Sequence, residues 1–200
     1  MLKYRPFEMH CHTRHSDGTF LVPQLIESVA AYGYAGLALT DHNAVTGLLE
    51  VTEELQRKNN CLVLPGIEWT TFYGHLLVIG CDRFVDWRFV TPDTIDEARA
   101  AGGIAGVAHP CEVGSPLMCG CNWEFRVKRW DLMDYVEIWS GPDPHASAKN
   151  GLAMPWYDAL LNQGYHLAIS AGRDWHGPDK PGQIPLLTAT YLGIDGDVTI

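Results

Sequence analysis

The sequence has no long apolar run, and residues 1–7 lack the apolar core of a secretion signal. A membrane-spanning helix needs about 20 consecutive, mostly apolar residues, and a signal peptide needs an apolar stretch behind a basic start. We therefore expect a cytoplasmic protein that does not insert into a membrane.

Basic residues are scarce. The 200 residues contain 14 Lys and Arg against 24 Asp and Glu, a formal net charge of −10 at pH 7. Nucleic-acid binding normally needs a basic patch, so this balance disfavours a polynucleotide partner. Divalent cations held by some of the acids would reverse the sign of the charge locally. A small, anionic substrate therefore remains compatible with the composition.

The six cysteines include no Cys-x-x-Cys pair, and Cys119 and Cys121 are separated by a single glycine. This spacing does not fit a zinc site closed by four protein ligands. Without a secretion signal, we expect reduced thiols in place of disulfides. The chain also lacks internal repeats, low-complexity tracts and a domain boundary, so we predict a single domain over residues 1–200.

Short apolar runs alternate with helical patterns and turn residues. The runs predict strands at residues 8–12, 36–40, 61–64, 75–80, 104–108, 135–139 and 166–171. Helices are predicted at residues 23–32, 46–58 and 154–162, and from Thr91 to about residue 102. This alternation indicates an α/β fold with a mostly parallel sheet, either a barrel or an open sheet. Residues 110–123, rich in Gly, Pro and Cys, are predicted to form a loop over the site or a subunit contact.

Histidines and acids gather where these strands end, at the edge where active sites of parallel α/β folds are built. Seven of the nine histidines lie there: His10, His12, His15, His42, His75, His109 and His176. Four acids accompany them: Asp17, Asp41, Glu68 and Asp174. A single histidine is more often a structural polar residue, and we interpret His145 and His166 in that way. The joint pattern predicts a metal site.

The spacing of His10 and His12 matches the strand period, so both imidazoles project from one face and can chelate a cation. The turn at Gly18 can bring Asp17 back towards a neighbouring cation. Imidazole and carboxylate together suit Zn, Fe or Mn.

At this point the sequence resembles the polymerase-and-histidinol-phosphatase (PHP) superfamily. The motifs that carry the resemblance occur in family order: His10-Cys-His12-Thr-Arg-His-Ser16-Asp17-Gly18, Thr40-Asp41-His42-Asn43, Pro65-Gly66-Ile67-Glu68, Gly74-His75, His109-Pro110 and Asp174-Trp-His176. Residues 137–141 and 156–164 are similar to the branch that includes carbaryl-hydrolysing enzymes.

The resemblance implies a distorted (β/α)7 barrel with two or three divalent metal ions, Zn, Mn or Fe, at the carboxyl ends of its strands. It assigns His10, His12, Glu68 and Asp174 to one cation, Asp17, His42 and His176 to a second, and Glu68, as a bridge, with His75 and His109 to a third. Many relatives have a small residue at the position of Arg173. This departure bears on the shape of the substrate pocket and not on the metal site.

Such a site favours hydrolysis, because adjacent divalent ions lower the pKa of a bridging water and so supply hydroxide. Arg14 and Arg173 are candidates for binding a substrate phosphate. His15 could protonate a leaving group, and Asp41 could orient an imidazole or accept a proton.

We therefore expect a metal-dependent hydrolase, most simply a phosphoesterase that acts on a small phosphate ester. An alternative keeps the metals but cleaves a carboxylic ester, carbamate or amide. A third possibility is a non-catalytic metal-binding or regulatory module. The sequence leaves open whether the chain forms an oligomer.

Overall fold

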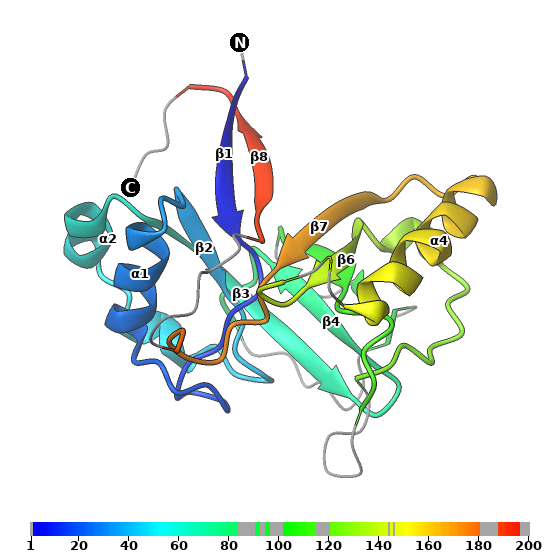
Figure 1. The fold of residues 1–200 in the computed structure, drawn as a ribbon, viewed down its shortest axis with the longest axis horizontal. Helices are drawn as coiled ribbons and strands as arrows, with labels where there is room; N and C mark the ends of the chain where they lie inside the picture. The colour runs from blue at the N-terminus through cyan, green and yellow to red at the C-terminus, as the bar shows by residue number, and fades with distance from the viewer. Residues whose placement is uncertain are drawn as a thin grey trace.

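The computed structural model describes residues 2–83, 91–92, 95–96, 102–114, 121–143, 145, 147–180 and 188–196. Within these residues, eight strands form one sheet in the order β7-β6-β5-β4-β3-β2-β1-β8 (Figure 1). The strands are β1 (Lys3–Glu8), β2 (Gly36–Leu39), β3 (Leu62–Thr71), β4 (Gly74–Ile79), β5 (Ile104–Val107), β6 (Tyr135–Ser140), β7 (Ala168–Gly172) and β8 (Thr190–Ile194). The helices are α1 (Val22–Ala31), α2 (Glu53–Asn59) and α4 (Ala148–Asn162), with the 3-10 turns η1 (Thr46–Glu50) and η3 (Trp130–Leu132).

The sheet curls until its two ends nearly meet, which confirms the predicted distorted barrel. Beyond β1 and β7 the chain segments lie side by side, since the His12 N–H donates to the Trp175 carbonyl (3.0 Å) and the Trp175 N–H to the His10 carbonyl (3.1 Å). At the opposite end, β8 pairs antiparallel with β1, and the Thr190 hydroxyl bonds the backbone of Ala171. The eighth strand was not predicted.

Two predicted strands have different bounds in the structure. The first was predicted at residues 8–12, but β1 ends at Glu8, and the extended chain beyond it makes only isolated bridges, at Cys11 and Thr13. Residues 3–7 of β1 pair with β8, and Phe7 and Glu8 pair with β2, so the regular pairing of this strand ends at Glu8.

β3 was predicted to end at Leu64, before Pro65-Gly66, yet it continues to Thr71. Up to Pro65 it pairs with β2 in parallel, and from Gly66 it pairs with β4 antiparallel. The Pro-Gly pair therefore marks a change of partner inside one strand. As a consequence, Glu68 lies within β3.

Helix α1 confirms the prediction for residues 23–32 to within a residue. Its buried residues Val22, Leu25, Ile26 and Val29 recur at helical spacing. The Gln24 side chain accepts the Leu21 N–H at the start of the helix. Burying each of these aliphatic side chains is worth about 1.5–3 kcal/mol before entropic costs. This packing fixes the chain that leads from the first strand into β2.

The single helix predicted at residues 46–58 is wrong, because the structure divides it into η1 and α2. Thr52 makes the break. Its hydroxyl accepts the Leu55 N–H (3.1 Å) as an N-cap and so begins a new helix. Helix α4 begins at Ala148, six residues before its predicted start, with Pro155 inside it.

Helices α1 and α2 lie on one side of the molecule beside β2, and α4 lies on the other beside β6 and β7 (Figure 1). In the described residues, no helix combines the length and apolar character needed to cross a membrane. Cys11, Cys61, Cys81 and Cys111 are free thiols. Cys119 lies outside the described residues, as do most of the helix predicted from Thr91 and the middle of the loop predicted at residues 110–123.

Candidate metal centre

The predicted metal ligands come from every part of the barrel and meet at one mouth. His42 and His109 follow β2 and β5, and Asp174 and His176 follow β7. β4 runs antiparallel to its neighbours, so His75, near its amino end, reaches the same mouth as groups at the carboxyl ends of the other strands. The predicted convergence of strand ends is therefore present, with one strand reversed.

Four of these side chains form an inner group, in which three are buried and Asp174 is partly exposed: His10, His12, Glu68 and Asp174. Glu68 Oε2 lies 3.1 Å from His10 Nε2 and 3.2 Å from His12 Nε2. Asp174 Oδ1 lies 3.2 Å and 3.1 Å from the same two nitrogens. Four donor atoms thus surround one point.

A second set, the rim group, comprises Asp17, His42 and His176, and His12 also lies within reach of it. Asp17 Oδ1 is 3.3 Å from His176 Nε2 and 3.6 Å from His42 Nε2. The turn that brings Asp17 here depends on Gly18, where a Cβ would lie 2.5 Å from the His12 carbonyl oxygen. These side chains are partly exposed.

Glu68 faces two sets of imidazoles at once. Its Oε1 lies 2.9 Å from His75 Nδ1 and 3.0 Å from His109 Nε2. Its Oε2 faces the inner group and also lies 3.0 Å from His42 Nδ1. A carboxylate that bridges two cations needs this arrangement, with one oxygen directed to each side.

The donors fit divalent cations. His10 Nε2 and Glu68 Oε2 are buried, and neither has a hydrogen-bond partner among the described residues. Donors that each lie about 2.1 Å from a common cation stand roughly 3.0–3.4 Å apart in tetrahedral or octahedral geometry, which matches the distances above. A set of imidazoles and carboxylates without thiolate suits Zn, Mn or Fe.

The charges of the metal-free site are mutually dependent. Burial raises the pKa of Glu68, but the imidazoles of His10 and His42 outweigh it and hold that pKa well below its usual value. Burial lowers the pKa of His109, but Glu68 outweighs it and raises the pKa to about 9. Without a cation, protons on imidazoles thus supply the positive charge. Cation binding must release them.

The backbone is strained at the mouth. His109 and Asp174 have φ angles of +21° and +48°, and Asn43, beside His42, has +49°. Residues other than glycine rarely adopt positive φ, and such strain persists where the surrounding structure enforces it. Three of the four described non-glycine residues with positive φ therefore lie at or beside proposed ligands.

Sequence reasoning missed Glu137, which supports the inner group from behind. This acid is buried in β6, its Oε1 lies 3.0 Å from His10 Nδ1, and its Oε2 accepts the His109 N–H (2.9 Å). A carboxylate on the far nitrogen of a ligating histidine fixes the orientation and tautomer of the ring. The available signal was an acid at a buried position of an apolar strand.

Glu8 was missed as well. Its Oε1 accepts the N–H groups of His10 and Arg173, and burial raises its pKa to about 8.

The structure gives the predicted catalytic residues other contacts. Asp41 accepts hydrogen bonds from Thr13 and Ser16, so it holds the turn before Asp17. The two ring nitrogens of His15 lie 2.9 Å from Thr46 Oγ1 and 2.8 Å from Glu50 Oε1, and His15 is not among the residues that line the cavity at the donors. Their catalytic roles stay predictions.

The predicted substrate-binding arginines are not among the residues that line the cavity at the donors. Arg14 is exposed and donates to the Thr19 carbonyl. Arg173 is 2% exposed, pairs with Asp179 and stacks 4.0 Å from the Trp175 ring.

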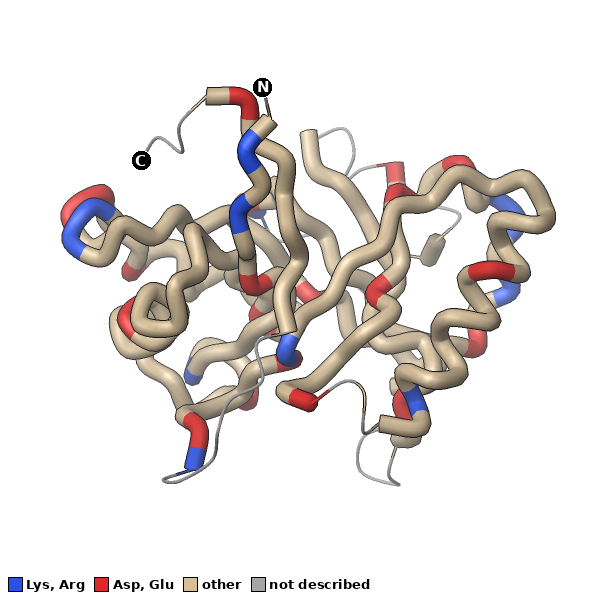
Figure 2. The backbone as a smooth tube through the Cα atoms, turned by 45° about the horizontal axis from the view of Figure 1, so that its top comes forward, with Lys and Arg blue, Asp and Glu red and all other residues tan. Residues whose placement is uncertain are grey.

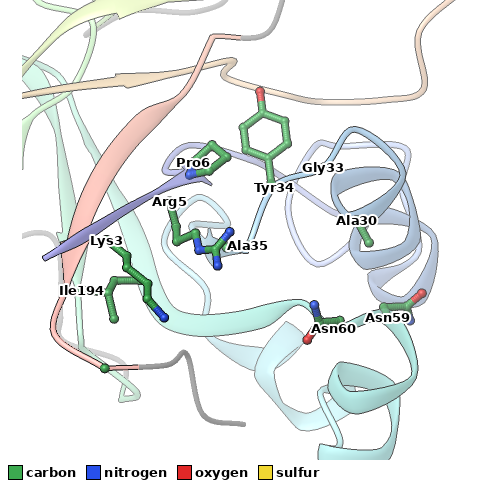
Figure 3. Close-up of a pocket in the computed structure, with 11 residues that line it drawn as sticks. Lys3, Arg5, Pro6, Ala30, Gly33, Tyr34, Ala35, Asn59, Asn60 and Ile194 are labelled. Atoms are coloured by element: carbon green, nitrogen blue, oxygen red, sulfur yellow. The ribbon is translucent and has the colours of Figure 1, made fainter. Parts of the chain in front are cut away.

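A cavity of about 260 Å³ opens beside the donors. Its lining comprises His42, His75, His109, Glu112, Val113, Gly114, Cys121, Lys149, Asp174 and His176. Lys149 is the basic side chain of this lining, and sequence reasoning missed it. A larger cavity of about 380 Å³ lies between the amino end of β1, Tyr34 and the end of α2 (Figure 3). None of the predicted site residues lines it, so the smaller cavity is the candidate site.

Comparisons with known proteins agree with this geometry. The model of the PHP domain family matches residues 8–113, slightly more than half of the chain. A 3',5'-nucleoside bisphosphate phosphatase of Chromobacterium violaceum is 34% identical over 79 residues, which cover 38% of this chain and 27% of the phosphatase.

Among solved structures, a two-domain protein of Bacteroides vulgatus containing a predicted PHP-like metal-dependent phosphoesterase matches with a TM-score of 0.65 and 19% identity, over 88% of this chain and 53% of that one. An amidohydrolase of Chromobacterium violaceum with bound sulfate matches with a TM-score of 0.60 and 20% identity, over 91% and 90%. These structures share the fold. The chain spans about a quarter of the curated relative and about half of the two-domain protein.

Proposed function

The chain belongs to the PHP domain family, and from this premise we propose that it is a metal-dependent hydrolase that cleaves a small phosphate ester. One observation carries the proposal. The two oxygens of Glu68 face separate sets of imidazoles beside a cavity large enough for a small molecule. We propose that residues 1–200 act as one domain, since one sheet, nearly closed into a barrel, takes its strands from the whole described chain.

The inner group would hold one cation, the rim group a second, and Glu68 with His75 and His109 a third. The cations would be Zn, Mn or Fe. When bound, divalent cations lower the pKa of a coordinated water towards neutrality and neutralise charge on phosphoryl oxygens. Every residue needed for these sets is at the mouth.

The chain's own residues prepare the site. The Glu137 carboxylate contacts His10 Nδ1, so His10 Nε2 is left to face Glu68 and Asp174. Thr70 Oγ1 lies 2.5 Å from His42 Nδ1, and Asn43 bonds the Thr70 backbone twice, which fixes that imidazole. A frame held in this way needs little rearrangement during reaction, and preorganised electrostatics of this kind is usually the largest catalytic effect.

The phosphatase of Chromobacterium violaceum supports a phosphate ester as the bond that is cleaved, because that relative is a nucleoside bisphosphate phosphatase. Charge gives further support. In Figure 2 the Lys and Arg positions are scattered along the tube with Asp and Glu positions between them, and the formal net charge of −10 disfavours a polynucleotide. A small phosphate ester needs only the cations and the cavity.

The direct test is metal analysis of the purified protein combined with a substrate panel. Protein supplemented with Zn, Mn or Fe should carry at least two equivalents and hydrolyse phosphomonoesters, and His10→Ala should abolish both properties. Turnover of aryl carboxylic esters alone would overturn the phosphoesterase proposal. No turnover of any ester by fully loaded protein would favour a non-catalytic metal-binding module.

A further inference from the structure

The lining of the cavity beside the donors contains two chemically different sets of side chains. One set is the proposed ligands His42, His75, His109, Asp174 and His176. The other includes Glu112 and Lys149, and Lys149 is the only Lys or Arg among the ten described residues of the lining. A ligand in this cavity would therefore meet an ammonium group as well as the proposed cation ligands.

Lys149 is held in place by the start of α4. It is the second residue of that helix, and the neighbouring Asn150 is buried. The Asn150 amide clamps Ser140, accepting its N–H and donating to its carbonyl, both at 3.0 Å. Ser140 ends β6, so this clamp ties the first turn of α4 to the mouth of the barrel. Lys149 thus approaches the cavity from a rigid element.

Glu112 is also held in place by the backbone. Its N–H donates to the carbonyl of His109 (2.9 Å), the strained residue that follows β5. Its carboxylate forms an ion pair with the Lys149 ammonium. The two side chains are 23% and 44% exposed, so water and solutes reach the pair from the cavity.

We propose that Lys149 binds the phosphoryl group of the substrate. In the absence of substrate the Glu112 carboxylate pairs with the Lys149 ammonium, and the incoming phosphoryl group displaces this carboxylate. The proposal rests on the proposed function and narrows its substrate class to phosphomonoesters. A monoester carries nearly two negative charges at neutral pH and can compete with a single carboxylate for the ammonium, whereas a diester carries one. Charge-assisted hydrogen bonds from ammonium to phosphate are among the stronger polar contacts in proteins.

Substitutions of Lys149 and Glu112 should change the Kd for phosphate in opposite directions. A purely structural ion pair would not give this result. Lys149→Met should raise the Kd for inorganic phosphate about tenfold or more, as expected for loss of a hydrogen bond to a charged group. Glu112→Gln should lower that Kd up to about fivefold, because it removes an exposed competing pair. Lys149→Arg should lie between Lys149→Met and the wild type.

The experiment is isothermal titration of the metal-loaded protein with inorganic phosphate, with kcat and KM measured for one phosphomonoester and one phosphodiester. Lys149→Met should raise KM for the monoester by a larger factor than for the diester, with a smaller change in kcat. The exposed pair Lys58 and Glu27, 3.3 Å apart outside the cavity, provides the controls Lys58→Met and Glu27→Gln. Thermal melts of all variants check folding.

The proposal is overturned if the wild type binds no phosphate, if Lys149→Met leaves the Kd unchanged, or if Glu112→Gln weakens phosphate binding as Lys149→Met does. The last result would mean that the ion pair matters only for structure. These outcomes differ from failure of the proposed function. In that case no phosphate ester is turned over, while the phosphate Kd still moves in opposite directions in the two variants.

Discussion

The inner and rim groups use the same residue types but differ in burial. In the inner group, three side chains are 0% exposed and that of Asp174 is 26% exposed. In the rim group, the side chains of His42, His176 and Asp17 are 19%, 35% and 48% exposed. The Glu137 carboxylate contacts His10 of the inner group. The rim histidines His42 and His176 line the cavity.

The difference in burial determines how firmly each group would hold a cation. A buried charge is costly unless it is paired, so the inner group needs a cation or protons at all times. The rim group is hydrated, so a cation proposed there would be lost at small cost. We expect the inner cation to stay bound during purification and the rim cation to exchange.

The largest effect should come from Glu68→Gln, because Glu68 alone among the proposed ligands is assigned to two cations. The variant keeps the side-chain volume, removes the negative charge and weakens one coordinating oxygen. Hydrolysis should fall by more than about 100-fold, the upper range for residues that touch only a ligand. Metal content should fall with it, and excess metal should restore part of the rate. Normal occupancy and turnover would exclude the bridge, and Glu27→Gln is the control.

Glu137→Gln tests the support of the inner group alone. The amide can still occupy the same place beside His10, but the charge that fixes the ring is gone. Metal affinity or activity should fall roughly 10–100-fold, less than for Glu68→Gln. Competition with a chelator measures the affinity, with Glu53→Gln on α2 as control. A loss confined to the rim cation would show that the two groups have been assigned the wrong way round.

Asp17→Asn tests the rim group. Because the inner donors are untouched, we expect one equivalent of metal to remain through dialysis and a second to bind more weakly than in the wild type. Stepwise titration with Mn²⁺ followed by elemental analysis would resolve the two events. Loss of both equivalents together would mean that the groups do not differ as their burial suggests.

The smallest effect concerns pH and the metal-free protein. The hydrogen bond from His176 lowers the pKa of Asp17 to about 2, and Asp17 and Asp174 outweigh burial and raise that of His176 to about 9. The stabilisation from Asp17 is present above its ordinary pKa of 3.8 and is lost as the pH falls towards 2. That from His176 is present below 6.5 and is lost as the pH rises through 9.

Asp17→Asn should therefore reduce the free energy of unfolding most between about pH 4 and 6.5, by roughly 0.5 kcal/mol for so exposed a pair. Urea unfolding of chelator-treated protein measures this difference. It should disappear near pH 10. A difference that stays constant from pH 4 to 10 would show that the pair contributes no charge interaction.

The alternation of strands and helices and the gathering of ligands could be predicted from the sequence pattern, because both depend on local patterns, whereas the barrel was implied by the family resemblance. Apolar runs such as residues 36–40 coincide with β2, and histidines after strands meet wherever the strands meet. The switch of partner inside β3 could not be foreseen, since Pro65-Gly66 is also a common strand terminator. β8 was missed because its exposed and half-buried positions give little apolar signal.

Residues that act through other residues were harder to predict. Glu137 and Lys149 belong to no metal-ligand spacing, and only the packing of β6 and α4 shows what they face. Arg173 illustrates the reverse case. Its position beside Asp174 suggested substrate binding, but the side chain is buried next to Asp179 and Trp175, so neighbours in sequence lie in different surroundings.

Glu68 is proposed to join two cations, and a crystal structure of the Mn²⁺-loaded protein with anomalous diffraction tests this most directly. We predict two strong anomalous peaks flanking the Glu68 carboxylate, about 3.5–4 Å apart as in other two-metal sites. One peak should lie among His10, His12 and Asp174, and the other beside His75 and His109. A single peak, or peaks that leave either Glu68 oxygen without a cation, would contradict the account.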